Sequence, residues 1–301
     1  MSEDQFTQQH PAEQYGQREG QPAQQQQTPP GNEQEMGPKP DHGEESYRGS
    51  DRLTGKRAII TGGDSGIGRA VALAYAREGA DVLITYLGDE EEKDARETVS
   101  LIEQAGRTGV AVQCDLREED NCRALVDRAL RDLGGVDILV NNAAYQMSQD
   151  NGLLDITTEQ FDRVFKTNVY AMFWLCKFAV PHMKEGSTII NTSSIQAFDP
   201  SPQLLDYATT KAAIANFTKA LAQNLADRGI RVNAVAPGPI WTPLIPATMP
   251  EEKVKQFGTD TPLGRPGQPA ELAPAYVYFA SQESSYVTGE ILGVTGGRPT
   301  K

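Results

Sequence analysis

The feature that most constrains the fold is an alternation of short aliphatic runs with longer amphipathic stretches, which continues from residue 58 to residue 294. Runs this short, rich in Val, Ile, Leu and Ala, have the length of buried β-strands rather than of helices. The expected strands are Ala58–Thr61, Val82–Tyr86, Val110–Cys114, Val136–Val140, Thr188–Asn191, Ile230–Val235 and Glu290–Val294.

The stretches between these runs show helical periodicity and charged faces. The expected helices are Gly66–Glu78, Glu90–Gln104, Glu118–Leu133, Glu159–Val180, Tyr207–Asp227 and a segment after Pro269. Strands that alternate with helices form βαβ units around a parallel sheet that is buried on both faces. The sequence therefore predicts an α/β fold, a doubly wound (Rossmann-type) three-layer sandwich with a seven-stranded parallel sheet, as a single domain over residues 49–301.

Residues 1–48 differ in composition from this body. They contain four consecutive glutamines at Gln24–Gln27 and almost no large aliphatic side chains. Such a segment buries too little apolar surface to offset the entropy lost on ordering, so a disordered, Gln/Pro-rich acidic tail is expected. A solubilising tail and an arm docked across a neighbouring subunit are both compatible with this composition.

Charge and residue usage exclude several classes of function. The net charge of −13 disfavours nucleic acid and anionic membranes as partners. Cys114, Cys122 and Cys176 lack metal-site spacing, which argues against a zinc site and favours a reducing, cytoplasmic compartment. His182 is the one histidine of the body and is expected to be structural, which argues against histidine acid–base chemistry.

A glycine-rich turn, Thr61–Gly68, follows the first strand directly and precedes a helix. Glycines at such a turn let the backbone approach a pyrophosphate, and the helix N-terminus favours its negative charge. Dinucleotide binding is therefore expected here. The predicted contacts in this turn are Gly62, Asp64, Ser65, Gly66, Ile67 and Gly68.

Further candidate cofactor contacts lie just after strands, where ligands bind in open α/β sheets. Asp115 could accept a hydrogen bond from an adenine amino group, and Ile240 and Thr242 could meet the nicotinamide end. The turn Asn141–Ala144 could be a plain turn or a wall of the cofactor site. The contacts expected at strand ends are Tyr86, Asp115, Leu116, Asn142, Ala143, Pro237, Gly238, Ile240 and Thr242.

Tyr207 and Lys211 are four residues apart and so share one face of a helix. An ammonium beside a phenol should lower the tyrosine pKa from about 10, giving an acid–base group for neutral pH. Ser194, after the fifth apolar run, could hold a substrate oxygen. By itself this spacing also occurs by chance on helix surfaces.

Together these residues resemble the short-chain dehydrogenase/reductase family over residues 50–298. The Gln/Pro-rich tail and the Gly-Gly-Asp-Ser-Gly turn are similar to bacterial general-stress-type oxidoreductases. Ala144 is a departure, because the family usually has glycine there. The resemblance implies a catalytic tetrad of Asn168, Ser194, Tyr207 and Lys211, with Lys211 also binding the nicotinamide ribose and Asn168 in a proton relay through water. It also implies NAD or NADP as cofactor, no metal and a homotetramer.

The choice between NAD and NADP stays open, because Tyr86 and Leu87 stand where the family's acidic or basic clamps usually lie. A small alcohol, aldehyde or ketone is expected as substrate, with a lid before residue 265. The expected pocket residues are Tyr145, Gln146, Gln196, Phe198, Leu204, Trp241 and Ile245, without a nearby arginine. A non-catalytic nucleotide-binding sensor, a stress-interaction protein acting through its tail and a nucleotide-sugar epimerase are the alternatives.

Overall fold

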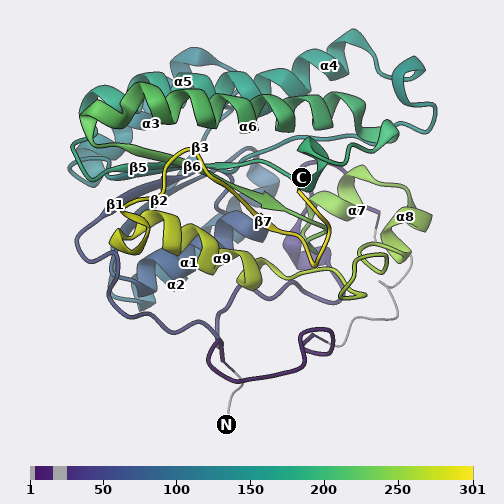
Figure 1. Ribbon diagram of the computed structural model, residues 1–301, viewed down its shortest axis with the longest axis horizontal. Helices are drawn as coiled ribbons and strands as arrows, with labels where there is room; N and C mark the ends of the chain where they lie inside the picture. Colours follow the sequence, from purple (N-terminus) through teal and green to yellow (C-terminus); the bar gives the residue numbers. More distant parts are fainter. Residues whose placement is uncertain (1–3, 16–25, 301) are drawn as a thin grey trace.

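A parallel sheet lies between two layers of helices in the computed structural model shown in Figure 1. The structure describes residues 4–15 and 26–300. The seven strands follow the order β3-β2-β1-β4-β5-β6-β7, and all neighbouring pairs are parallel. The predicted α/β doubly wound fold is confirmed. The strands are β1 Arg57–Ile60, β2 Asp81–Tyr86, β3 Gly109–Gln113, β4 Ile138–Asn141, β5 Thr188–Thr192, β6 Arg231–Pro237 and β7 Ile291–Val294.

Helices cover both faces of the sheet, with α1, α2 and α9 on one side and α3, α4, α5 and α6 on the other (Figure 1). Side chains alternate along β1, so that Ala58 and Ile60 join one core cluster and Ile59 joins the other. The helices are α1 Gly66–Arg77, α2 Glu92–Gln104, α3 Glu119–Asp132, α4 Thr158–Phe165, α5 Ala171–Ala179, α6 Leu205–Leu225, α7 Leu244–Thr248, α8 Glu251–Lys255 and α9 Pro269–Ala280.

The strand order reverses beside β1, which pairs with β2 on one side and with β4 on the other. Loops that leave β1 and β4 therefore diverge at the carboxyl edge of the sheet and leave a crevice between them. This topology places the glycine-rich turn after β1 next to the Asn141–Ala144 turn after β4.

The expected continuous helix Glu159–Val180 is interrupted. A π-helical turn, Lys166–Tyr170, separates α4 from α5. A π turn inserts an extra residue and changes the direction in which its side chains point. Asn168 belongs to this turn and is buried, so the departure from a regular helix bears on the site itself.

The expected disorder of residues 1–48 does not hold for the described residues 4–15, where the carbonyl oxygen of Pro11 accepts hydrogen bonds from Arg265, or for residues 26–48, which we call the N-terminal arm. Glu33, Met36, His42 and Tyr47 are all buried against the body. Composition reflects the apolar surface that a segment can bury, whereas this arm is held by an ion pair to Arg69 of α1 and a hydrogen bond to Asp94 of α2. Part of the expected tail, residues 1–3 and 16–25, lies outside the described residues.

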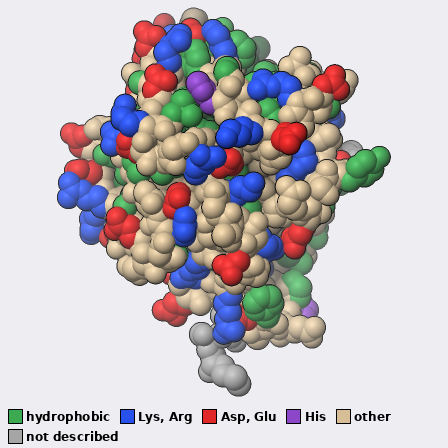
Figure 2. All heavy atoms as spheres, turned by 90° about the vertical axis from the view of Figure 1, so that its left-hand side faces the viewer, with side chains coloured by type: hydrophobic (Ala, Val, Ile, Leu, Met, Phe, Trp, Pro, Cys, Tyr) green, Lys and Arg blue, Asp and Glu red, His purple; other side chains and the backbone are tan. Residues whose placement is uncertain are grey.

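The surface shows no concentration of basic charge on the face in Figure 2, where acidic and basic side chains are interspersed. Among the described residues, no helix is both long and apolar enough to cross a membrane.

Glu78, directly after α1, is fully buried and links the arm to the body. Its carboxylate accepts hydrogen bonds from Tyr47 Oη at 2.7 Å, from Arg52 Nη2 at 2.6 Å and from the backbone N–H of Ser50 at 3.0 Å. Burial alone would raise the pKa of Glu78, but hydrogen bonds from Arg52, Tyr47 and the backbone outweigh it and lower the pKa to about 2.

Replacing Glu78 with alanine is expected to lower the free energy of unfolding by about 3 kcal/mol, because it leaves the donors around the buried carboxylate unpaired. Urea titration at neutral pH measures this, and Glu45→Ala, at an exposed acidic residue of the arm, is the matched control. The stabilisation by Glu78 is complete above the ordinary pKa of 4.5 and is lost as the pH falls through about 2. Equal unfolding midpoints for the two variants would contradict this role.

Candidate active site

A cavity of about 560 Å³ opens at the carboxyl edge of the sheet, where the topology predicts a ligand. The structure brings nearly all the predicted site residues to its wall. Those that line it are Gly62, Asp64, Ser65, Gly66, Ile67, Tyr86, Asp115, Leu116, Asn142, Ala143, Ser194, Tyr207, Lys211, Pro237, Gly238, Ile240 and Thr242. Gly68 and Asn168 are not part of this lining.

The backbone conformation of the glycine-rich turn requires glycine at several of its positions. Gly62 and Gly66 have φ angles of +61° and +51°, in the left-handed region that favours glycine. A Cβ atom at Gly68 would lie 1.9 Å from the carbonyl oxygen of Gly62, so no side chain fits there. Gly62 and Gly66 line the cavity at the N-terminus of α1, an arrangement that suits the pyrophosphate of a dinucleotide.

Asn142 supports this turn instead of acting only as a wall. Its Nδ2 donates to the carbonyl oxygens of Thr61 at 3.0 Å and Gly62 at 3.1 Å. In return, Thr61 Oγ1 accepts from the backbone N–H groups of Asn142 at 2.9 Å and Ala143 at 3.0 Å. The loops after β1 and β4 are therefore locked together, which holds the glycine-rich backbone in place.

The loop after β2 presents a carboxylate that sequence reasoning missed. Glu91 is buried, and its Oε2 accepts from the backbone N–H groups of Leu87 at 2.7 Å and Gly88 at 3.1 Å. Burial, together with the nearby Glu91 charge, raises the pKa of Asp64 well above its usual range. In the sequence, the acidic run Asp89–Glu92 was the one feature that could have pointed to a carboxylate at this position.

Asp115 lies at the cavity wall after β3, as expected, but it is paired within the protein. Arg117 Nη2 lies 2.6 Å from its Oδ2, and this hydrogen bond is the main reason why the pKa of Asp115 is lowered. Arg117, also at the cavity wall, was not among the predicted residues. A charged Asp115 remains able to accept a further hydrogen bond at its edge of the cavity.

Tyr207 and Ser194 meet at the cavity. Ser194 comes from the loop after β5, and Tyr207 lies in the first turn of α6. Burial raises the pKa of Tyr207 to about 12, although a hydrogen bond with Ser194 acts in the opposite direction. The expected lowering of the Tyr207 pKa is therefore wrong for this structure, because burial disfavours the phenolate more strongly than its neighbours favour it.

Lys211 lies one helical turn after Tyr207 and is buried. Its Nζ donates to the carbonyl oxygen of Thr192 at 2.8 Å and lies 5.3 Å from the centre of the Tyr207 ring. Burial lowers the pKa of Lys211 to about 7. The side chain thus points into the site between β5 and α6, with its charge sensitive to pH near neutrality.

Asn168 lies behind Tyr207 and lines a small neighbouring cavity. Its Nδ2 donates to Thr210 Oγ1 at 3.0 Å and to the carbonyl oxygen of Tyr145 at 3.0 Å, while its Oδ1 accepts from the Tyr145 backbone N–H at 2.8 Å. Thr210 Oγ1 in turn donates to the carbonyl oxygen of Tyr207 at 2.7 Å. Asn168 therefore connects the loop after β4 to the helix of Tyr207 through Thr210, a residue that the sequence pattern did not single out.

The far end of the cavity matches the expected substrate pocket in part. Tyr145, Gln146, Gln196, Leu204 and Ile245 line it, whereas Phe198 and Trp241 do not. Trp241 is fully buried in a separate cluster with Met36, Ile245 and Val254.

The expectation of a pocket without arginine is wrong. The guanidinium of Arg163 lies 4.0 Å from the centre of the Tyr145 ring, and Arg163 also lines the cavity. The residue comes from α4, which is distant in sequence from the strand ends, so strand-end reasoning could not find it.

Comparison with known proteins links this geometry to oxidoreductases. A family model described as enoyl-(acyl carrier protein) reductase matches residues 62–298. General stress protein 39 of Bacillus subtilis (strain 168) is 55% identical over 276 residues, which cover 92% of this chain and 96% of that protein. NADPH-dependent aldehyde reductase 1, chloroplastic, of Arabidopsis thaliana is 47% identical over 91% of this chain and 96% of that protein.

A solved structure has the same arrangement of elements. The crystal structure of a short-chain dehydrogenase from Burkholderia cenocepacia J2315 in complex with NADP superposes with a TM-score of 0.76 and 35% sequence identity. The match covers 82% of this chain and 98% of that chain.

Proposed function

The chain belongs to the short-chain dehydrogenase/reductase family, and we propose that it transfers a hydride between NAD or NADP and a small alcohol, aldehyde or ketone, with Tyr207 as the acid–base group. The observation behind this proposal is that Tyr207 and Ser194 line the same cavity as the glycine-rich turn. When bound, the cofactor supplies the hydride chemistry, and the protein supplies position and electrostatics.

Each residue of the proposed tetrad has a distinct task. Ser194 donates a hydrogen bond to the reacting oxygen and stabilises the negative charge that develops there. Tyr207 gives its phenolic proton to that oxygen during reduction and takes it back during oxidation. Lys211 holds hydroxyl groups of the nicotinamide ribose, and Asn168 positions α6 through Thr210.

The protonation state of Tyr207 supports reduction as the favoured direction at neutral pH. A pKa of about 12 keeps the phenol protonated, so a proton donor is in place when a carbonyl receives a hydride. Oxidation of an alcohol needs the phenolate instead and should gain rate as the pH rises. NADPH-dependent aldehyde reductase 1 of Arabidopsis thaliana, by its name, also acts on a carbonyl substrate.

Charge around the adenosine ribose subsite supports NAD over NADP as the preferred cofactor. Glu91 occupies the backbone N–H groups of Leu87 and Gly88, which would otherwise suit an anion. A 2′-phosphate would bring about two negative charges to a loop whose backbone donors are already bound to the Glu91 carboxylate. One relative is named for NADPH and a similar solved structure is a complex with NADP, so both cofactors belong in the test.

A screen of aldehydes, ketones and alcohols with NADH, NADPH and their oxidised forms tests the proposed reaction through nicotinamide absorbance. We expect turnover of aldehydes or ketones with reduced cofactor at pH 7, with a lower KM for NADH than for NADPH. Failure of every carbonyl and alcohol in the presence of demonstrably bound cofactor would contradict an oxidoreductase of this substrate class. A lower KM for NADPH than for NADH would overturn only the cofactor preference.

A further inference from the structure

The N-terminal arm reaches the same cavity as the glycine-rich turn. Pro29 and Pro30 line this cavity together with Asp64 and Ser65. They are distant in sequence from every other residue of the wall, and no strand end places them there. The arm is thus in a position to contact whatever lies against the glycine-rich turn.

On one side the arm packs on the segment after β6, residues 241–257. The backbone N–H of Gln27 donates to the carbonyl oxygen of Pro246 at 3.1 Å. A Cβ atom at Gly31 would lie 2.7 Å from the carbonyl oxygen of Pro243, so the two backbones are in close contact. Met36 completes the apolar cluster of Trp241, Ile245 and Val254, which means that this segment folds around the arm.

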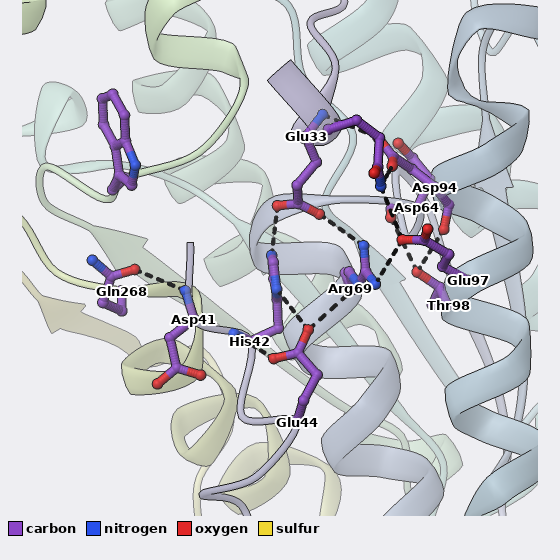
Figure 3. Close-up of polar contacts among 12 residues, drawn as sticks. Glu33, Asp41, His42, Glu44, Asp64, Arg69, Asp94, Glu97, Thr98 and Gln268 are labelled. Carbon is purple, nitrogen blue, oxygen red and sulfur yellow. Dashed lines mark hydrogen bonds and ion pairs between the residues drawn. The ribbon is translucent and has the colours of Figure 1, made fainter. Parts of the chain in front are cut away.

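On the other side the arm is fixed to α1 and α2 by a buried ionic network (Figure 3). Glu33 is its centre: Oε2 lies 3.0 Å from Arg69 Nη1, and Oε1 lies 2.7 Å from His42 Nε2. The backbone N–H of Glu33 donates to Asp94 Oδ2 of α2 at 3.0 Å. We call Glu33, His42 and Arg69 the anchor.

His42 of the anchor is protonated at neutral pH. Burial by itself would lower the pKa of His42, but the carboxylates of Glu33 and Glu44 outweigh it and raise the pKa to about 9. Glu33 and His42 are 2% and 3% exposed, so removal of one charge leaves its partner buried without compensation. Arg69 directly follows Gly68, so the anchor holds the arm to the first turn of the helix that presents the glycine-rich turn.

We propose that the N-terminal arm is part of the dinucleotide-binding site, with Pro29 and Pro30 as a wall beside the cofactor's pyrophosphate and the anchor as the device that positions this wall. The inference rests on the proposed function, because it requires a dinucleotide at the glycine-rich turn. A wall fixed to both α1 and segment 241–257 narrows the exit from the cavity, so the arm slows cofactor release. Preorganised contact of this kind raises affinity mainly by lowering the dissociation rate.

Two full-chain variants test the wall and its anchor separately. The double variant Pro29→Ala with Pro30→Ala removes the rings and leaves the anchor intact. Glu33→Gln keeps the shape of the side chain but removes its charge. Both are expected to release NADH and NADPH about tenfold faster in stopped-flow fluorescence, with a matching rise in Kd. Glu35→Gln, at an exposed residue two positions along the arm, is the matched control and should release them at the wild-type rate.

The outcomes separate this inference from the proposed function. If the unaltered protein binds neither NADH nor NADPH, both the function and the arm's role are overturned. If it binds them but the proline double variant releases them at the wild-type rate, only the arm's role is overturned. The double variant also decides the matter if Glu33→Gln does not fold, because it leaves every ion pair of the anchor in place.

Discussion

Tyr207→Phe is expected to lower turnover by about 10²–10⁴-fold, the range typical of a positioned acid–base group. The substitution removes one oxygen and leaves the aromatic ring, so the packing of α6 should persist. The phenol of Tyr207 is the proposed source of the proton for the reacting oxygen, and Tyr207 and Ser194 both line the cavity. Affinity for NADH or NADPH should change little.

The measurement pairs steady-state turnover, on the best substrate of the screen, with fluorescence titration of the reduced cofactor. Tyr286→Phe is the matched control, because Tyr286 is fully exposed and far from any proposed chemistry. Wild-type turnover in the Tyr207 variant would exclude this residue as the acid–base group. A large loss of cofactor affinity together with lost turnover would instead show that the residue acts mainly in binding.

Lys211→Met is expected to lower both turnover and cofactor affinity, with a loss in kcat/KM of at least about 10²-fold, because the ammonium has two proposed tasks. It would hold the nicotinamide ribose, and it adds a positive charge one helical turn from Tyr207. Methionine preserves much of the volume, so the buried space between β5 and α6 stays filled. The substitution does remove the hydrogen bond from Nζ to the carbonyl oxygen of Thr192.

The pH dependence of cofactor affinity gives a second readout for Lys211. Burial lowers its pKa to about 7, so the ammonium is present below pH 7 and is lost as the pH rises through about 7. Contact with ribose hydroxyl groups favours the charged form and raises its pKa in the complex. By linkage, affinity should therefore be greatest below pH 7 and should fall as the pH rises above about 7.

Titrations of NADH binding between pH 6 and pH 9 distinguish the expected cases. In the Lys211→Met variant the fall in affinity near pH 7 should disappear. Lys219→Met, at an exposed lysine of the same helix, is the control and should retain it. An identical pH profile in the wild type and the Lys211 variant would assign the titration to another group and remove the basis for the ribose contact.

Much of the fold was predictable because its signals are local. An aliphatic run such as Ala58–Ile60 is buried on both faces, since neighbouring residues point to opposite core clusters. The π-helical turn at Lys166–Tyr170 was not predictable, because the helical pattern continues through it. Its effect on Asn168 arises from hydrogen bonds to Tyr145 and Thr210, which other segments provide.

In the candidate site, too, some features could be predicted from local sequence and others could not. Spacing in the chain indicated the glycine-rich turn and the pairing of Tyr207 with Lys211, because residues of one turn or one helix face are neighbours whatever surrounds them. Glu91 and Arg163 were missed because they reach the cavity from a loop and a helix beyond the strand ends. The direction of the Tyr207 pKa was wrong because desolvation depends on every residue packed around the phenol.

The sequence by itself determined the parallel sheet and the glycine-rich turn from periodicity and short-range spacing, whereas the proposed role of Tyr207 came from the family resemblance. Only the tertiary structure showed that the N-terminal arm is ordered on the body. Its composition favours disorder, yet Glu33 forms ion pairs with Arg69 and His42, and Met36 packs in a cluster with Trp241. Such contacts join residues far apart in the chain, and they stabilise the arm only when the fold has brought their partners together.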